Sequence, residues 1–236
     1  MVTALDAGAD DYIVKPCEEN ELRARIHVGG RILALQDELF RSREQLRRQA
    51  TIDSLTGLLN RRAIIAALSG ELARAAREQK PTGVLMLDID RFKQINDGYG
   101  HEVGNEVLRA FVARSDSCIR KGSDWLARVG GDEFLVVLPE TNAIGASRVA
   151  QKLHRVFARF PVATHAGPVT FTASIGVTAV DADHEVKDAS KIEDLLRAAD
   201  RGLYASKKLG GNQATSSSIR IAKKPVRQPG GKNGIN

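Results

Sequence analysis

The feature that most constrains the fold is an apolar segment that ends in acidic residues. Residues 83–89 carry apolar side chains on both sides of a strand, and Asp88 and Asp90 stand at its end. A strand that is apolar on both faces belongs in the interior of a sheet. A carboxylate at the end of such a strand loses hydration, which costs free energy unless a positive group meets it. The chain is therefore expected to build a sheet around this strand, with a charged site at its end.

The rest of the main domain, expected over residues 53–212, alternates helical and strand patterns. Residues 130–132, Gly-Gly-Asp, are a hairpin signal between two strands. The elements follow the order α-β-α-β-β-α-β-α, which predicts an α+β fold of ferredoxin type, with an antiparallel or mixed sheet and helices on one face. Helices are expected over residues 61–78, 104–120, 143–160 and 192–209, and strands over residues 83–89, 125–129, 133–138 and 169–180.

Two acidic strand ends form the candidate site. If the strands that carry Asp88 and Asp132 are neighbours, both carboxylates point at one spot. Oxygen ligands without His or Cys select Mg²⁺ or Mn²⁺, and a pair of such ions can activate one oxygen and stabilise a phosphate. The paired glycines Gly130 and Gly131 allow a backbone to approach a ligand and to offer N–H groups to phosphate. Gly-Gly-Asp is also a common tight turn, but beside an acidic strand end it favours a nucleotide site.

Polar residues gather in the loop expected over residues 88–105. Lys93 lies close to free backbone amides after the strand, which suits a triphosphate. Asn96, His101 and Asn105 could read a base edge. A single Asn or His is more often a turn residue, but several in one loop beside Asp88 favour binding.

Charge and composition narrow the class of protein. Among 236 residues, 35 are basic and 29 acidic, which gives a net charge of +6. The tail, residues 213–236, holds five basic residues and no acidic one, so the body is nearly neutral, which argues against a nucleic-acid groove. This Ser/Pro/Gly-rich tail is expected to be disordered; simple solvation is favoured over contact with nucleic acid or anionic lipid.

No signal for export or membrane insertion stands out in the sequence. No apolar run approaches the ~18 residues of a membrane span, and the acidic N-terminus does not resemble a secretory signal. The cysteines, Cys17 and Cys118, suit a reducing compartment and neither has a partner at zinc-ligand spacing. A cytoplasmic protein is expected.

Two N-terminal segments precede the main domain. Residues 1–26 resemble the last βα unit of a bacterial receiver domain, with Lys15-Pro16 after the final strand. The strand that bears the phosphorylated Asp is not in the sequence, so this fragment is expected to be a vestige or poorly ordered. Residues 27–52 predict a charged helical stalk with an a/d seam, and a parallel dimer is favoured over a single helix packed on its own domain. The seam is formed by Ile32, Leu35, Leu39, Leu46 and Ala50.

Four motifs in order identify the main domain by resemblance. They are residues 53–62 (DSLTGLLNRR), the DxDxFKxxND…GHxxG pattern from Asp88, residues 128–134 (RVGGDEF) and residues 199–207 (ADRGLYASK). Together they resemble the GGDEF-domain diguanylate cyclases over about 160 residues. No phosphodiesterase segment of the EAL type follows them in this sequence.

The resemblance implies that two GTP molecules condense to cyclic di-GMP and two pyrophosphates in an antiparallel homodimer. It implies that Asp88, the Ile89 carbonyl and Asp132 bind Mg²⁺ or Mn²⁺, two ions per site, and that Asp132 activates the ribose 3′-hydroxyl. It further implies that Lys93 stabilises charge on the phosphates and that Lys207 holds the γ-phosphate. Glu133 joins Asp132 and Lys93 as a catalytic residue. The substrate-binding residues implied are Phe92, Asn96, His101, Asn105, Gly130, Gly131 and Lys207.

Three positions depart from the family's usual pattern. Asn105 replaces an aspartate, and an amide matches an adenine edge better than a guanine edge, so mixed cyclic GMP-AMP is a possible product. Lys121 replaces the arginine of an RxxD product-inhibition motif that ends at Asp124, which predicts weak product inhibition. Gly211 replaces a phosphate-contacting arginine, which predicts weaker triphosphate affinity. An active cyclase is favoured over a nucleotide-binding module without turnover, and over an interaction-only role for the N-terminal segments.

Overall fold

The computed structural model describes residues 6, 8, 12, 16–181 and 189–217, and the chain divides into two compact units. The first unit comprises residues 1–50 and the second residues 51–236. Residues 1–5, 7, 9–11 and 13–15, which include most of the strand expected before Lys15-Pro16, lie outside the described residues, so the expectation of a receiver fragment stays a prediction.

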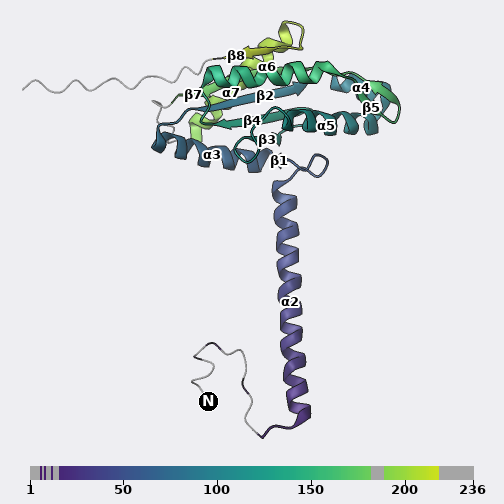
Figure 1. Cartoon of the computed structure of the whole chain (residues 1–236), viewed down its shortest axis with the longest axis vertical. Coiled ribbons are helices and arrows are strands. Elements are labelled where there is room, and N and C mark those ends of the chain that lie inside the picture. The colour runs from purple at the N-terminus through teal and green to yellow at the C-terminus, as the bar shows by residue number, and fades with distance from the viewer. Residues whose placement is uncertain (1–5, 7, 9–11, 13–15, 182–188, 218–236) are drawn as a thin grey trace, which may run out of the picture. The chain divides into compact units, whose positions relative to one another are not determined.

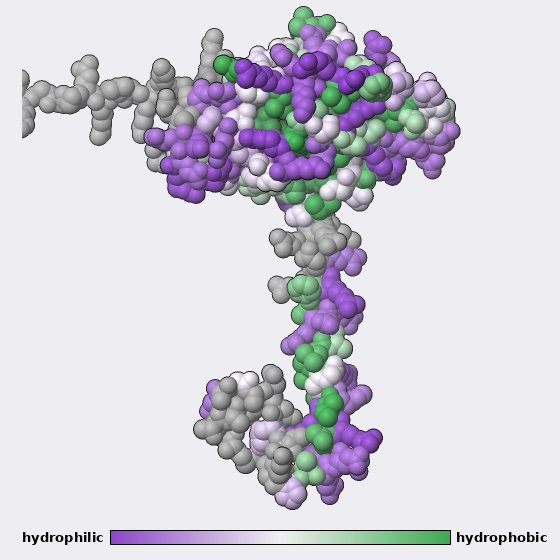
Figure 2. All heavy atoms as spheres, viewed as in Figure 1, coloured by the Kyte–Doolittle hydropathy of each residue, from purple (hydrophilic) through white to green (hydrophobic). Residues whose placement is uncertain are grey.

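The first unit consists mainly of one helix, α2 (Glu19–Thr51). It begins within the expected receiver fragment, residues 1–26, and continues through nearly all of the stalk helix expected over residues 27–52. Ion pairs one turn apart, Arg23–Glu19 and Arg25–Glu21, stabilise its first turns. Apolar side chains lie uncovered along this helix (Figure 2), among them Ile32, Leu33, Leu35, Leu39 and Phe40, all more than half exposed.

The second unit is built on a central, mostly antiparallel sheet, as the sequence predicts, and this sheet has six strands (Figure 1) where four were expected. The strand order is β1-β3-β4-β2-β7-β8, so β2 lies inside the sheet between β4 and β7. Three neighbouring pairs are antiparallel, and only the edge pairs β1–β3 and β7–β8 are parallel. The strands are β1 (Leu59–Asn60), β2 (Thr82–Ile89), β3 (Trp125–Arg128), β4 (Glu133–Pro139), β7 (Ala173–Val180) and β8 (Ala214–Ser216).

Helices cover both faces of this sheet, so the expectation of helices on one face is wrong. Alternate residues of β2 serve two separate cores: Leu85 and Leu87 belong to one, Val84 to the other. The first core lies under α5 (His101–Asp116) and α6 (Ala143–Arg159), the second under α3 (Arg61–Glu78) and α7 (Ala189–Lys208). The apolar character of both sides of β2 was the sequence signal for two covered faces.

Close packing fixes both layers. In the first core, the ring of Phe111 stacks on Phe134 and Phe157 at centroid distances of 4.2 and 4.4 Å. On the other face, α7 crosses β7 at Gly176, where an added Cβ would stand 2.0 Å from the carbonyl oxygen of Ala199. The backbone of α7 therefore lies directly against the sheet, which positions the residues at its C-terminal end.

Several short elements were not predicted. The loop expected over residues 88–105 contains α4 (Phe92–Tyr99) and the start of α5. The strand expected over residues 169–180 is divided: β6 (Gly167–Val169) pairs with β5 (Val162–Thr164) in a separate hairpin, and β7 begins at Ala173. The edge strand β8 lies beyond the boundary expected at residue 212, so the sheet extends into the segment expected to be a tail.

Candidate functional site

The acidic ends of β2 and β4 lie side by side, as the site hypothesis requires. The antiparallel register places Asp88 opposite Glu133. The backbone N–H of Ile89 donates to the carbonyl oxygen of Asp132 at 3.2 Å, which joins the Gly-Gly hairpin to the end of β2. Three carboxylates therefore come from two adjacent strand ends.

Lys207 reaches this acidic group from the last turn of α7. Its Nζ lies 2.6 Å from Oδ2 of Asp88, whose side chain is 8% exposed, whereas that of Lys207 is 43% exposed. Burial, together with the negative charges of Asp132 and Glu133, raises the pKa of Asp88 to about 6, although Lys207 opposes this shift. The site thus holds more negative charge than one lysine compensates.

The Gly-Gly hairpin is held from behind by Arg128. Its guanidinium donates to the carbonyl oxygen of Gly131 from Nε at 3.1 Å and from Nη2 at 2.6 Å. The same side chain pairs with Asp53 at 3.2 Å, and Asp53 in turn accepts from the backbone and hydroxyl of Thr56. The motif that begins at Asp53 therefore supports the turn that presents Asp132.

Asp90 has a different task from Asp88, although it lies only two residues away. Its carboxylate accepts from the hydroxyls of Thr172 and Ser174, at 2.7 and 2.6 Å, and from the backbone N–H of Asn212 at 2.8 Å. An added Cβ at Gly211 would stand 2.9 Å from Oδ1 of Asp90, and Gly211 has a φ of +76°. Asp90 thus ties the loop after α7 to β2, and only glycine suits that loop's close approach.

The residues expected to contact the base lie on α4 and α5. Asn96 packs over Gly104 so closely that a Cβ there would stand 1.9 Å from its Oδ1. This contact joins the two helices beside Asn105, which is half-buried, as is Asn96. His101 begins α5 and is exposed. The structure therefore brings Asn96 and the Gly104–Asn105 step together.

The remaining predicted residues lie at the start of α4 and in the hairpin. Lys93 is exposed on the first turn of α4, and Phe92 before it is buried in the first core. Gly130 is packed against Glu133, since a Cβ on Gly130 would stand 2.6 Å from a carboxylate oxygen of Glu133. An exposed lysine side chain and a tight glycine turn are both compatible with a bound phosphate.

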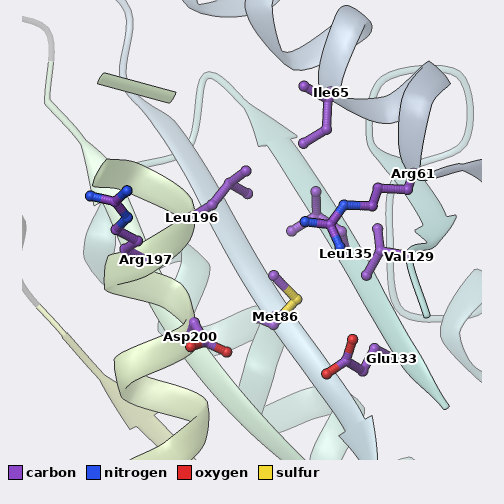
Figure 3. A pocket seen from close by; sticks show the side chains of 9 residues that line it. All are labelled: Arg61, Ile65, Met86, Val129, Glu133, Leu135, Leu196, Arg197 and Asp200. Carbon is purple, nitrogen blue, oxygen red and sulfur yellow. The ribbon is translucent and has the colours of Figure 1, made fainter. Parts of the chain in front are cut away.

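A cavity of about 300 Å³ borders the acidic group on the α3–α7 face (Figure 3). Its floor is apolar, and the carboxylates of Glu133 and Asp200 flank Met86 in the close-up view. Arg61 from α3 and Arg197 from α7 complete its charged rim. The cavity leaves Glu133 accessible from the face on which Asp88 and Lys207 meet.

The donor set fits a divalent cation that is completed by a ligand. Among the described residues, no three His, Cys, Asp or Glu side chains are grouped so as to hold a metal by themselves. The set consists of the carboxylates of Asp88 and Asp132 and the carbonyl of Ile89, all oxygen donors. Mg²⁺ is commonly bound by one or two carboxylates together with substrate phosphates. An excess of negative charge and an incomplete oxygen shell both suit that arrangement.

Sequence reasoning missed three contacts at this site. The Asp53–Arg128 pair, the role of Asp90 and the Lys207–Asp88 pair all join residues far apart in the sequence. Both members of the two ion pairs, and Asp90, stand inside the motifs already singled out, but a motif does not show which side chains pair. Only the fold shows which of these side chains meet.

Comparison with known proteins identifies the family. The sequence model described as "Diguanylate cyclase, GGDEF domain" matches residues 50–213, which is more than half of the chain. The protein therefore belongs to the GGDEF-domain family. A crystal structure of the coiled coil and GGDEF domain of DgcB from Caulobacter crescentus, in complex with c-di-GMP, aligns with a TM-score of 0.70 and 29% identity, covering 83% of this chain and 99% of that one.

Curated relatives of this chain include proteins with different roles. The response regulator PleD of Caulobacter vibrioides is 36% identical over 214 residues, 90% of this chain and 46% of PleD. The cyclic di-GMP phosphodiesterase NbdA of Pseudomonas aeruginosa is 35% identical over 86% of this chain and 25% of NbdA. The chain thus spans less than half the length of either relative. None of the described helices is long and apolar enough to cross a membrane.

We expect Asp88→Asn to stabilise the metal-free fold at high pH. The folded-state pKa of Asp88 is about 6 against an ordinary value of 3.8, so the ionised form costs stability above pH 6 and the cost vanishes below pH 4. The variant should be more stable by about 1–2 kcal/mol at pH 8, and the gain should fade as the pH falls through that window. Urea unfolding in EDTA measures it.

The matched control is Asp116→Asn, at an exposed carboxylate on α5. This control substitution should leave the free energy of unfolding nearly unchanged from pH 8 down to pH 4. A wild type that is more stable than Asp88→Asn at pH 8 would contradict the charge crowding inferred for the site.

Proposed function

We propose that the protein is a diguanylate cyclase that joins two GTP molecules into cyclic di-GMP and releases two pyrophosphates. The observation that carries the proposal is the meeting of Asp88, Asp132 and Glu133 at two paired strand ends. Membership of the GGDEF family and the intact GGDEF hairpin support the same conclusion. In-line phosphoryl transfer depends on alignment and charge, which this site offers, more than on covalent chemistry.

Each residue of the acidic site and its two lysines has a separate role in the proposed reaction. Asp132 accepts the proton of the ribose 3′-hydroxyl, whose oxygen attacks the α-phosphate of the partner's GTP, while the bond from that phosphorus to pyrophosphate breaks. Lys93 and Lys207 hold the phosphates and offset their charge. Asp88, the Ile89 carbonyl and Asp132 would hold Mg²⁺ or Mn²⁺, with Glu133 beside them. When bound, these ions neutralise phosphate charge and make the 3′-hydroxyl a better nucleophile.

The base is recognised between α4 and α5. Asn96 and Asn105 face its edge, with His101 nearby at the start of α5 and Phe92 beneath the site. Gly130 and Gly131 let the hairpin backbone approach the nucleotide. Each protomer of a homodimer holds one GTP, so that two half-sites form one complete site.

Incubation of the protein with GTP and Mg²⁺, followed by chromatography of the products, tests the proposal. Cyclic di-GMP and pyrophosphate should appear, and Asp132→Asn should lower kcat by about 10²–10⁴-fold, since it removes the base. Asp116→Asn, an exposed acid at the end of α5, serves as control.

The alternative outcome is also informative. If GTP raises the thermal stability of the wild type but no pyrophosphate is released, the protein is a nucleotide-binding module without turnover. The glycine at position 211 favours that alternative, because the loop there packs on Asp90 and offers no side chain to a phosphate. No GTP binding at all would overturn both.

We expect the product to inhibit the enzyme weakly. Asp124 of the RxxD-like segment is turned inward: its side chain is 2% exposed and pairs with Arg120 at 2.6 Å. Arg120 also donates to the carbonyl oxygen of Pro139, while Lys121 is 84% exposed. Initial rates should therefore be unchanged at micromolar cyclic di-GMP.

Two variants make the product test sharper. Lys121→Arg should fail to create inhibition because Asp124 stays occupied, whereas the double variant Arg120→Ala/Lys121→Arg should gain product binding. Micromolar inhibition of the wild type would contradict the prediction.

We expect relaxed base selectivity at Asn105. A carboxylate accepts from both N–H donors of a guanine edge, whereas an amide leaves one of them without an acceptor. Asn105→Asp should raise the ratio of kcat/KM for GTP over ATP by about 5- to 150-fold, which corresponds to 1–3 kcal/mol. Assays with GTP, ATP and their mixture, with separation of cyclic di-GMP from cyclic GMP-AMP, measure this ratio. A wild type that makes cyclic di-GMP alone at high rate from the mixture would refute the idea.

We expect α2 to carry a dimer contact. Ile32, Leu35 and Leu39 keep heptad spacing and are exposed, which suits a two-stranded seam. Leu35→Glu should shift the protein from dimer to monomer in sedimentation velocity and lower its activity at low concentration. Leu33→Glu is the matched control, because Leu33 is also exposed but follows Ile32 directly and faces another side of the helix. Equal effects of the two substitutions would exclude the seam.

A further inference from the structure

The pair between Lys207 and Asp88 carries an inference beyond the proposed function. Its Nζ–Oδ2 distance of 2.6 Å is that of a strong charge-assisted hydrogen bond. Asp88 is one of the residues proposed to bind a divalent cation, and Lys207 is proposed to bind a phosphate. In the structure, the ammonium group of the lysine contacts the carboxylate of Asp88.

The contact places two cations in competition for one oxygen. An ammonium group at hydrogen-bond distance from Oδ2 and a divalent ion on the same oxygen would repel each other strongly in this poorly hydrated place. Asp88 is nearly buried, so it gains much from whichever cation is present. The carboxylates of Asp132 and Glu133 close by add to the attraction for positive charge.

Lys207 is able to leave this position. Its side chain is 43% exposed and stands on the last turn of α7, so its flexible stem can turn without any change in the helix. The phosphates of a bound triphosphate would offer the ammonium group another anionic partner. Asp88 is then free for a metal ion.

We propose that Lys207 occupies the cation position at Asp88 until a triphosphate draws it away, so that nucleotide binding and metal binding favour each other. The inference rests on the proposed function, since it assigns metal and phosphate ligands as above. Coupling of this kind is reciprocal: the factor by which nucleotide raises metal affinity equals the factor by which metal raises nucleotide affinity. A site without nucleotide would hold metal only weakly.

Titration of the nucleotide-free protein with Mn²⁺, followed by electron paramagnetic resonance of the free ion, tests the inference. At pH 8, where Asp88 is ionised, Lys207→Gln should bind Mn²⁺ about 5- to 150-fold more tightly than the wild type. Lys207→Arg keeps the positive charge and should bind as weakly as the wild type. Lys208→Gln is the matched control, because Lys208 lies over the ring of Tyr204 at 4.8 Å.

Equal Mn²⁺ binding by the wild type and Lys207→Gln, including no measurable binding by both, overturns the inference. Weaker binding by Lys207→Gln overturns it as well. Thermal unfolding of each variant shows that it is folded. A crystal structure with a non-hydrolysable GTP analogue and Ca²⁺ gives a second readout, in which Lys207 should contact phosphate and no longer Asp88.

The titration is independent of turnover. It contains no nucleotide, so a failure to make cyclic di-GMP would leave its result unchanged. Tight Mn²⁺ binding by Lys207→Gln with no cyclase activity in the wild type would uphold the exchange of cations and refute the proposed function.

Discussion

Negative charge at the end of a strand buried on both faces is the constraint on which the rest of this structure depends. β2 lies between β4 and β7, and its side chains belong to two cores. Its terminal carboxylate, Asp88, therefore enters a place with little water. The neighbouring strand end adds two more acids. Cations beside these carboxylates reduce the electrostatic cost, and the ammonium group of Lys207 is one such cation.

The parts of the site are fixed by groups that do not belong to it. Arg128 holds the carbonyl of Gly131 and is itself held by Asp53, from the start of the domain. Asp90 holds the loop at Asn212, whose carbonyl accepts from the ring of His154 on α6. Two aspartates separated by one residue at the end of β2 thus have different roles. Asp88 pairs with Lys207 of α7, and Asp90 accepts hydrogen bonds from three donors.

The sequence allowed the main elements of the second unit to be predicted, because their signals are local. The apolar run of β2, the glycine hairpin and the amphipathic helices each lie within one short window. The second covered face was missed because the ferredoxin-type analogy outweighed what the two apolar sides of β2 already indicated. The helix α4 was missed because its eight residues carry Gly98 and polar side chains, and its stability comes from packing of Phe92 and Ile95.

The candidate site was predictable as a set of residues but not as a set of contacts. Motif order placed Asp88, Asp132 and Lys207 in one family pattern, and strand adjacency then followed from the register. The ion pair between Lys207 and Asp88 depends on where α7 crosses the sheet. The spacing of residues in the sequence does not reveal that crossing point. Likewise, the sequence indicated only that Gly211 replaces an arginine. The fold shows that a glycine is required there, because the loop lies close to Asp90.

The crossing of α7 over β7 at Gly176 has a kinetic consequence. Backbone packs on backbone there, and at Gly202 an added Cβ would stand 2.7 Å from the carbonyl oxygen of Thr215, so the helix has no room to slide. Any relocation of the ammonium group of Lys207 is then a rotamer change about its own bonds, which takes picoseconds to nanoseconds. Under the proposed function, such a step would be too fast to limit turnover, and a slower event, such as the encounter of two loaded protomers, would set the rate.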